Sequence, residues 1–449
     1  MTSARDQLMD LITEPSQCFS VPTKELVPLQ VEAARDLFTA RRQQIQVLDR
    51  RARDTGTDAI GTVEDLIPLL FPHTTYKSYP QAFVKNRRWD RMTTWLGSIS
   101  THPTTNVDVE GVEDIDDWIA RLYAAGHLVS TTSGTGGKSS ILNRTVGDHA
   151  FFRKCLSESF GWPDPIRHER SRHFFFFGPR SGPYTAMIAN EILVDLYARP
   201  DSQHYLSDEP LRLAYLTELA EMRQRMADGS ATPADISAMD ERSAEQALRT
   251  RARLEIMVDA IATVHREPLF LSGPWAQLWG VMEQLRAQGI GDGDFHPDTI
   301  LAAGGGTKGA NLPDDYREQL LKYFGNPLKQ HVYGMSELSQ NFPVCEAGNF
   351  HQVPWVVPFV LDDRGESQIG AREGVVEGRF GFADLATEGR WNALITGDRV
   401  SIDFREQCPC GRTGLVILPN ISRYVGPGQD DKIGCAGTID AYVTGAISE

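Results

Sequence analysis

The sequence predicts an α/β protein in which parallel sheets are flanked by helices and are followed by a β-rich subdomain. Short apolar runs alternate with helical patterns between residues 174 and 333, which is the pattern of parallel strands joined by crossover helices. Beyond residue 342 the apolar runs are shorter and are separated by Gly and Asp turns, which favours antiparallel strands. Glycine-rich loops follow several predicted strands, and ligands of such sheets bind beyond the carboxyl ends of the strands.

The composition excludes several classes of function. With 449 residues, 41% of them hydrophobic, the chain is long enough for two or three domains with their own cores. A formal net charge of −15 argues against nucleic acid or an anionic membrane surface as a partner. The sequence has neither a signal-peptide pattern nor an apolar run of ~20 residues, so we expect no membrane insertion and a cytoplasmic location.

Three regions follow from changes of pattern along the chain. Residues 1–105 are predicted as an N-terminal helical region with a connector, because apolar residues recur there every three or four positions. Residues 106–342 are predicted as the α/β nucleotide-binding core, with a polar, helix-forming insertion at about 207–259. Residues 343–449 are expected to form the β-rich subdomain and a C-terminal tail.

The order of elements in the core follows from its apolar runs. We expect strands at 174–177, 269–271, 299–303 and about 330–333, and helices at about 183–197, 274–288 and 313–324. Ser272 is predicted to cap the helix that starts near residue 274. The glycines of residues 304–309 and the segment 333–337 then lie just past strand ends.

Residues 130–140 have the composition of a loop that binds polyphosphate. Glycines let backbone N–H groups converge, hydroxyls donate further hydrogen bonds, and Lys138 supplies a point charge. The P-loop of classical NTPases would also need a glycine five residues before Gly137, where this chain has Thr132, so that match fails. A plain surface turn is the alternative for a lone Gly/Ser run.

Four motifs in chain order resemble those of the adenylate-forming superfamily of acyl-CoA synthetases, luciferases and peptide-synthetase adenylation domains. They are residues 132–138, 304–306, 333–337 and 396–398. Residues 73–80, the loop from Gly304 to Lys308, and residues 408–414 resemble more specifically the acyl-protein synthetase of bacterial luminescence and the related phenylacetate-CoA ligases. The resemblance covers roughly residue 60 to the end, and implies the large N-terminal part of an adenylate-forming enzyme.

The implied reaction is activation of a carboxylic acid by ATP to an acyl-adenylate, followed by transfer to a thiol. The thiol acceptor is the enzyme's own cysteine, CoA, a carrier protein or a partner enzyme. The sequence does not identify the acid. The alternatives are an acyl- or aryl-CoA ligase or carrier-protein ligase and, in another class, a noncatalytic nucleotide-binding protein that binds ATP without exchange.

The chemistry of the motif residues fits this reaction. Lys138 is expected to hold the β- and γ-phosphates with the loop residues Thr132, Ser133, Gly134, Thr135 and Gly137. Glu337 is expected to bind Mg²⁺, a hard ion that prefers carboxylate and phosphate oxygens. Catalysis is then mainly electrostatic, with Lys138 and Glu337 as the catalytic residues.

The nucleoside contacts are expected from the later motifs. Gly304, Gly305 and Gly306 let the backbone approach adenine, on which Tyr333 stacks. Asp398 accepts hydrogen bonds from the ribose hydroxyls, and Gly334 and Ser336 complete the loop around the nucleotide. The remaining predicted contact is Arg423, which replaces the arginine expected where Gly428 stands.

Two features depart from the superfamily pattern. The phosphate loop commonly ends in a second lysine, where this chain has Ser140. The mobile C-terminal domain, with the lysine that usually assists adenylation, is expected to be absent. Both departures suggest the noncatalytic alternative. For the ligase, the missing domain implies either a branch that works without it or a truncated chain.

Two sets of cysteines are candidates for chemistry. Cys345, His351, Cys408 and Cys410 form a possible Cys₃His set for structural Zn²⁺, and reduced, packed cysteines are the alternative. The luminescence acyl-protein synthetases are acylated on a cysteine near the C-terminus, which makes Cys435 a candidate nucleophile. Flanking glycines are expected to leave its thiol accessible, with Lys432 lowering the thiol pKa, whereas a lone cysteine between small residues is most often inert.

Overall fold

The computed structural model describes residues 2–132, 138–304, 311–329 and 331–424, together with residues 433, 435, 438–439 and 441–444. The chain divides into two compact units. The first unit comprises Met1–Pro165 and Val332–Glu449, and the second comprises Ile166–His331.

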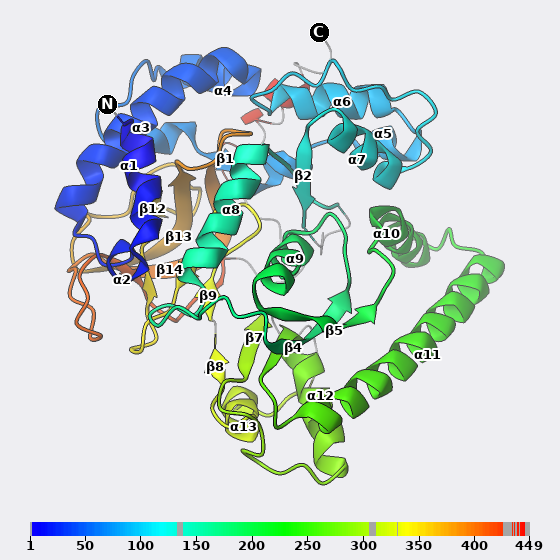
Figure 1. Ribbon diagram of the computed structural model, residues 1–449. Coiled ribbons are helices and arrows are strands. Elements are labelled where there is room, and N and C mark those ends of the chain that lie inside the picture. The colour runs from blue at the N-terminus through cyan, green and yellow to red at the C-terminus, as the bar shows by residue number, and fades with distance from the viewer. Residues whose placement is uncertain are drawn as a thin grey trace. The chain divides into compact units, whose positions relative to one another are not determined.

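The second unit contains the predicted parallel sheet (Figure 1). Its five strands lie in the order β5-β4-β6-β7-β8, and every pair is parallel. The strands are β4 (Arg172–Pro179), β5 (Ala198–Ser207), β6 (Leu269–Pro274), β7 (Ile300–Gly304) and β8 (Leu328–Lys329). The crossover helices α9 (Thr185–Tyr197), α12 (Trp275–Ala287) and α13 (Tyr316–Tyr323) lie close to their predicted positions.

The four consecutive phenylalanines of β4 are all buried, because apolar residues pack against both faces of this strand. Phe174 stacks on Phe270, and Tyr197 of α9 stacks on that same ring. Phe175 and Phe177 point to the opposite face, where they join a buried cluster with residues of α12 and α13. Both faces of β4 are therefore buried, as in most parallel sheets.

The structure corrects three details of the predicted core. The last strand of the parallel sheet is β8, whereas β9 (Val332–Tyr333) pairs antiparallel with β10 (Phe342–Pro343) in the first unit. Ser272 lies inside β6 and does not cap α12, which starts after Pro274 without a side-chain cap. Strand β5 was not predicted, because it is a polar edge strand with little apolar periodicity.

The segment in which a helical insertion is expected, about residues 207–259, contains α10 (Leu213–Ala227) and most of α11 (Pro233–Val264). A capping box starts α11, in which the side chains of Thr232 and Asp235 each accept from the other's backbone N–H. The buried residues of α11 lie near its C-terminal end, so most of this helix is solvated.

The N-terminal part of the first unit is helical. Its helices are α1 (Ala4–Asp10), η1 (Leu11–Thr13), α2 (Pro15–Cys18), α3 (Thr23–Gln44), α4 (Gln46–Thr55), η2 (Glu64–Leu69), η3 (His73–Lys77), α5 (Gln81–Lys85), α6 (Trp89–Ser98), α7 (Ile115–Ala124) and α8 (Val146–Ser159). Helix α7 begins at the N-cap Asp114, whose carboxylate accepts from the backbone N–H groups of Asp116 and Asp117.

The β-rich part of the first unit is a 7-stranded sheet. Its strands are β11 (Phe350–His351), β12 (Val356–Leu361), β13 (Val375–Asp384), β14 (Ala393–Asp403) and β15 (Val416–Ile417), with β1 (Phe71–Pro72) and β16 (Ser422–Arg423) paired to β14. Because β1 pairs in parallel with β14, residues 71–80 start beside Leu394 and Ile395. A separate hairpin, β2 (Leu128–Thr131) and β3 (Ile141–Arg144), flanks the predicted phosphate loop.

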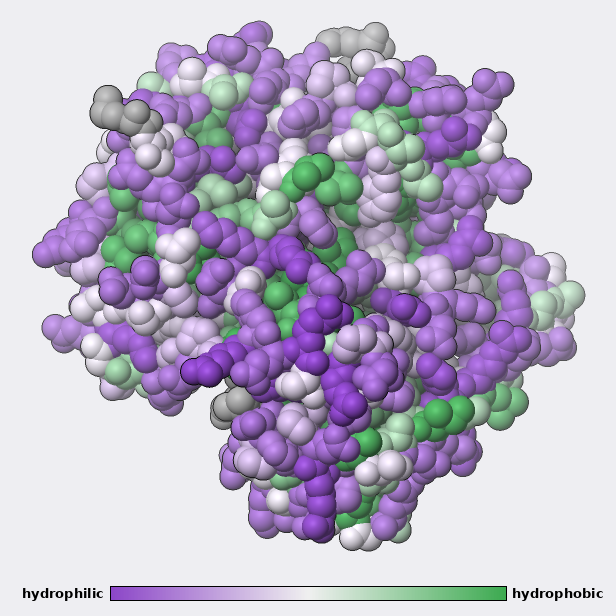
Figure 2. Space-filling view, viewed as in Figure 1, coloured by the Kyte–Doolittle hydropathy of each residue, from purple (hydrophilic) through white to green (hydrophobic). Residues whose placement is uncertain are grey.

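The face of the molecule drawn in Figure 2 is mostly polar. On the face drawn in Figure 2, hydrophilic residues predominate and hydrophobic ones gather in small patches. The insertion contributes exposed apolar side chains, Tyr215 and Met226 on α10 and Leu248 and Ile256 on α11. Within the described ranges, none of the helices combines the length and the apolar content that a membrane crossing requires.

Candidate active site and metal centre

Three of the predicted nucleotide-binding residues meet in the first unit. The Tyr333 hydroxyl donates a hydrogen bond to Asp398 Oδ2 at 2.9 Å, and Arg423 donates to Asp398 Oδ1 at 2.8 Å. Asp398 and Arg423 are directly opposed residues of β14 and β16. The sheet therefore brings together residues from motifs that are separate in the sequence, and both oxygens of Asp398 accept a hydrogen bond.

The ring of Tyr333 lies in a cluster of aromatic side chains. It is 8% exposed, and ring centroids of Phe342, Phe350 and Phe380 lie at 6.0, 5.9 and 5.6 Å. Burial, with the neighbouring carboxylate of Asp398, raises the pKa of Tyr333. The tyrosine is thus fixed by packing on its ring and by a hydrogen bond at its tip; its stacking on adenine stays a prediction.

Glycine is required next to this tyrosine. A Cβ atom at Gly334 would overlap the side chain of Asn341, which folds over the loop. Any other residue at this position would force either the Asn341 side chain or the loop to move. The glycine of this motif therefore has a packing reason that is independent of any ligand.

Glu337 is a buried carboxylate, 9% exposed. Burial raises its pKa, whereas its own backbone N–H and the charges of Arg390, Lys77 and Arg144 favour the ionised form. Its backbone carbonyl accepts hydrogen bonds from Arg390 at 2.6 Å and from Asn392 at 2.7 Å. The position of Glu337 is therefore fixed through its main chain, which leaves the carboxylate available to a ligand.

Arg144 joins the hairpin of the phosphate loop to the segment that carries Glu337. It is the last residue of β3, and its guanidinium donates to Ser130 Oγ at 2.9 Å and to the Ser336 carbonyl at 2.8 Å. Burial, with the nearby charge of Arg390, lowers the pKa of Arg144 to about 10. Sequence reasoning missed this residue, although a charged side chain that ends the apolar strand after the loop was a visible signal.

The base of the predicted phosphate loop is closed by Thr132 and held by Tyr79. Thr132 Oγ1 accepts from the Ser140 N–H at 3.0 Å. Lys138 donates to the Tyr79 carbonyl at 2.6 Å and lies 5.2 Å from the Tyr79 ring centroid. The Tyr79 hydroxyl donates to the Ser139 carbonyl at 3.1 Å. Residues 73–80 thus support the end of the loop.

The remaining predicted nucleotide contacts stay predictions. Ser133, Gly134, Thr135, Gly137, Gly305 and Gly306 lie outside the described residues. Gly304 is the last residue of β7, at the carboxyl end of a parallel strand of the second unit, and a Cβ atom there would meet no other atom within 4 Å. Its place matches the expectation for a ligand-facing loop.

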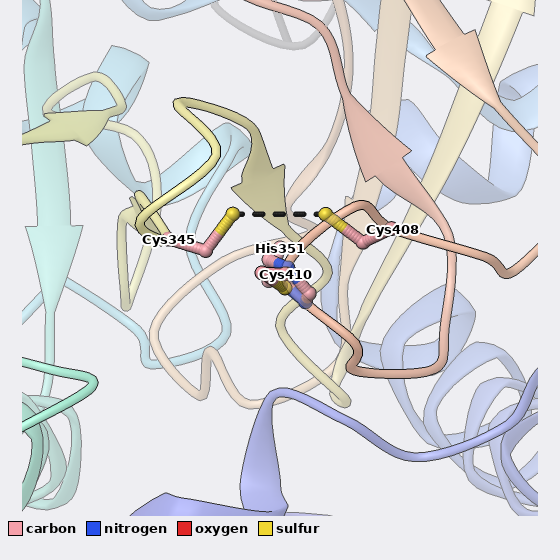
Figure 3. A group of neighbouring side chains, drawn as sticks. All are labelled: Cys345, His351, Cys408 and Cys410. Atoms are coloured by element: carbon pink, nitrogen blue, oxygen red, sulfur yellow. Dashed lines mark hydrogen bonds between the residues drawn. The ribbon is translucent and has the colours of Figure 1, made fainter.

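The predicted Cys/His set is confirmed as a cluster (Figure 3). One ligand atom from each of Cys345, His351, Cys408 and Cys410 lies within 4.8 Å of all the others. The two closest pairs are Cys345 Sγ and Cys408 Sγ at 3.6 Å, and Cys410 Sγ and His351 Nε2 at 3.4 Å. Cys410 is partly exposed and the other three are buried.

The surroundings of the cluster prepare it for a soft metal ion. His351 Nδ1 donates to the Phe19 carbonyl at 2.8 Å, which leaves Nε2 facing Cys410 as an acceptor. Burial lowers the pKa of His351 to about 4, so the imidazole is neutral, and burial raises the pKa of Cys345 to about 12. Burial opposes ionisation of Cys410, but hydrogen bonds from Arg412 and the other thiols lower its pKa overall. Three sulfurs and one imidazole suit tetrahedral Zn²⁺.

Cys435 is buried, contrary to the expectation of an accessible thiol. It is 6% exposed, and its Sγ donates to the Leu70 carbonyl at 3.7 Å. The neighbouring Ile433 is also buried. The flanking glycines and Lys432 lie outside the described residues. In this conformation the thiol contacts protein, so a role as nucleophile requires the segment to open.

Comparisons with known proteins give a likeness of fold. No protein-family model matches the chain, and no curated protein matches it. Two crystal structures of 2-hydroxyisobutyryl-CoA ligase are similar at 12% sequence identity, both in complex with 2-HIB-AMP and CoA. The open conformation has a TM-score of 0.55, over 90% of this chain and 71% of that one. The thioesterification state has a TM-score of 0.56, over 91% of this chain and 70% of that one. The chain thus has the α/β fold of an adenylate-forming ligase.

Proposed function

We propose that this protein activates a carboxylic acid with ATP and passes the acyl group to a thiol. The observation that carries the proposal is the meeting of Tyr333, Asp398 and Arg423, which were assigned to one nucleotide from separate stretches of sequence. The same unit holds Glu337 and Lys138. The likeness of fold to an acyl-CoA ligase supports the same conclusion.

In the proposed reaction a carboxylate oxygen of the acid attacks the α-phosphorus of ATP. The bond from that phosphorus to the bridging oxygen breaks, and pyrophosphate leaves. A thiolate then attacks the acyl carbonyl, and AMP leaves with the electron pair of the broken acyl–oxygen bond. Lys138 and the hydroxyls of its loop would stabilise the charge on the β- and γ-phosphates, while Asp398 and Arg423 would hold the ribose.

Glu337 fits Mg²⁺, because its carboxylate is the kind of ligand that this ion combines with phosphate oxygens. Mg²⁺ would neutralise phosphate charge. The positive charges of Arg390, Lys77 and Arg144 favour the ionised form of Glu337, which is the form that binds Mg²⁺. We infer that Glu337 serves the metal–nucleotide complex rather than a free cation.

The test is pyrophosphate release from ATP across a panel of fatty, aryl and amino acids. We expect release that depends on the acid, and ATP–pyrophosphate exchange that is lost in Lys138→Ala and Glu337→Ala while the fold is kept. A phosphate-releasing NTPase would act without any acid. A noncatalytic nucleotide-binding protein would bind ATP and show no exchange with any member of the panel, which would contradict the proposal.

The acceptor thiol separates two versions of the function. In the acyl-protein synthetase version the acyl group passes to Cys435 of the protein itself before transfer to a partner enzyme. In the alternative version the acceptor is CoA or a carrier protein, and the solved ligase that shares the fold binds CoA. The burial of Cys435 favours the second version.

We also propose that Cys345, His351, Cys408 and Cys410 bind structural Zn²⁺. All four coordination positions of a tetrahedral ion are supplied by protein atoms, which leaves no open position for substrate. Phe19 fixes the orientation of the histidine from another part of the chain. The ion would tie β11 and the loop that carries Cys408 and Cys410 to the N-terminal helices.

A further inference from the structure

We propose that Lys77 is a further phosphate-binding residue, whose ammonium group contacts the phosphate chain of ATP. The inference rests on the proposed nucleotide site and adds a second lysine to it. Lys77 is the last residue of η3, and its charge acts on the Glu337 carboxylate. Residues 73–80 also carry Tyr79, the contact of Lys138, so this segment serves both lysines.

The other two cations near Glu337 are already engaged with the protein. Arg144 donates to Ser130 and Ser336, and Arg390 donates to the carbonyls of Asn143 and Glu337. Both arginines are buried. Lys77 is partly exposed, and among the described residues no hydrogen bond or ion pair of its ammonium group is recorded. Its donors are therefore available to a ligand.

The other two buried carboxylates of this region accept their hydrogen bonds from the main chain and not from Lys77. Asp384 accepts from the backbone N–H groups of Ser339 and Ala386, and Asp148 accepts from those of Glu388 and Gly389. These carboxylates are satisfied by the main chain. The negative charges of these two carboxylates still act on Arg144, whereas the ammonium group of Lys77 is left to contact a phosphate oxygen.

The segment that carries Lys77 is held on both sides. The Tyr76 hydroxyl donates to the Trp391 carbonyl at 2.6 Å, and Arg390 lies 5.5 Å from the Tyr76 ring centroid. Ser78 Oγ accepts from the Trp95 indole at 3.0 Å. The backbone at Lys77 is therefore already ordered, so phosphate binding has to order only the lysine side chain.

The competing explanation is an ion pair in which Lys77 only neutralises Glu337. The experiment compares the binding of Mg-ATP and of AMP to the full chain by titration calorimetry, for wild type, Lys77→Met and Lys77→Arg. Lys85→Met, an exposed lysine at the end of α5, is the matched control. We expect Lys77→Met to weaken ATP binding about tenfold and to leave AMP binding unchanged, because a charge-assisted contact to phosphate is lost.

Lys77→Arg is expected to retain most of the ATP affinity, and the control to behave as wild type. An equal loss of ATP and AMP affinity, or no loss at all, in folded Lys77→Met would overturn the inference, as would a wild type that binds no ATP. The measurement needs no acid substrate. A protein whose ATP binding depends on Lys77 but which shows no exchange with any acid would refute the ligase proposal alone.

Discussion

Arg423 and Asp398 form an ion pair across two paired strands, β14 and β16, with 2.8 Å between Arg423 Nη1 and Asp398 Oδ1. The arginine side chain is 72% exposed and the aspartate 16%. An exposed pair contributes little to stability, commonly below ~1 kcal/mol. The pairing matters for the proposed site, because it places the Arg423 guanidinium beside the carboxylate proposed to bind the ribose. The position where the superfamily pattern has an arginine holds Gly428 in this chain.

We therefore predict that Arg423→Ala raises the KM for ATP by about tenfold, because a charged hydrogen-bond donor to the nucleotide is lost. The melting temperature should change little. Steady-state pyrophosphate release at varied ATP measures the effect. Arg405→Ala is the matched control, because Arg405 is also exposed and pairs with another aspartate of β14, Asp403. An unchanged KM in Arg423→Ala, or an equal rise in both variants, would refute the assignment.

Tyr333 predicts a pH dependence of stability. Burial raises the pKa of Tyr333, so the folded state favours the neutral phenol, and this contribution to stability is complete below the unfolded pKa of ~10. It is lost as the pH rises from there toward the folded pKa, because the unfolded chain releases the proton first.

The matched comparison is Tyr333→Phe, which keeps the ring and removes the hydroxyl. At neutral pH this variant should be less stable by ~1 kcal/mol, since the hydrogen bond to Asp398 is lost. Urea unfolding followed from pH 8 to 11 should show the difference shrinking above pH ~10. A difference that stays constant over this range would show that the tyrosine titrates alike in both states.

The features that the sequence predicted correctly are those that depend on residues close together in the chain. The four consecutive phenylalanines at residues 174–177 predicted a buried strand. The prediction succeeded because both faces of this strand pack against apolar residues. Strand β5 could not be read in this way, since Arg199, Asp201 and Gln203 occupy a sheet edge. Short local patterns report burial of one segment, and say little about polar edges.

The site shows the same limit. The residue types of the motifs indicate their chemistry directly. Asp398, Glu337 and the Cys₃His set could therefore be identified as candidates from the sequence alone. The hydrogen bond from Arg144 to Ser336 joins residues 192 positions apart, and no local pattern encodes that contact. The burial of Cys435 against Leu70 is also a long-range property, whereas flanking glycines describe only the local backbone.

The Cys₃His cluster predicts one zinc ion per chain, found by elemental analysis of protein purified without chelator. Cys408→Ser should lose the ion and lower the melting temperature by about 5 °C or more, because a structural site contributes to folding. The maximal exchange rate at saturating ATP should change much less. Cys155→Ala, at a buried cysteine outside the cluster, is the control for lost packing alone. Zinc-free wild type, with equal stability in Cys408→Ser, would leave the cysteines as packing residues.

Cys435 provides the last test, which separates the two versions of the proposed function. If the protein acylates itself, incubation with ATP and a competent acid should add one acyl mass, and Cys435→Ser should abolish the adduct. Because the thiol is buried and donates to the Leu70 carbonyl, the adduct should form slowly relative to adenylation. Mass spectrometry of the intact chain over time measures both. Cys18→Ser, at another buried cysteine of the first unit, controls for nonspecific acylation. Unmodified wild type that makes acyl-CoA when CoA is added would rule out the self-acylating version and retain the ligase.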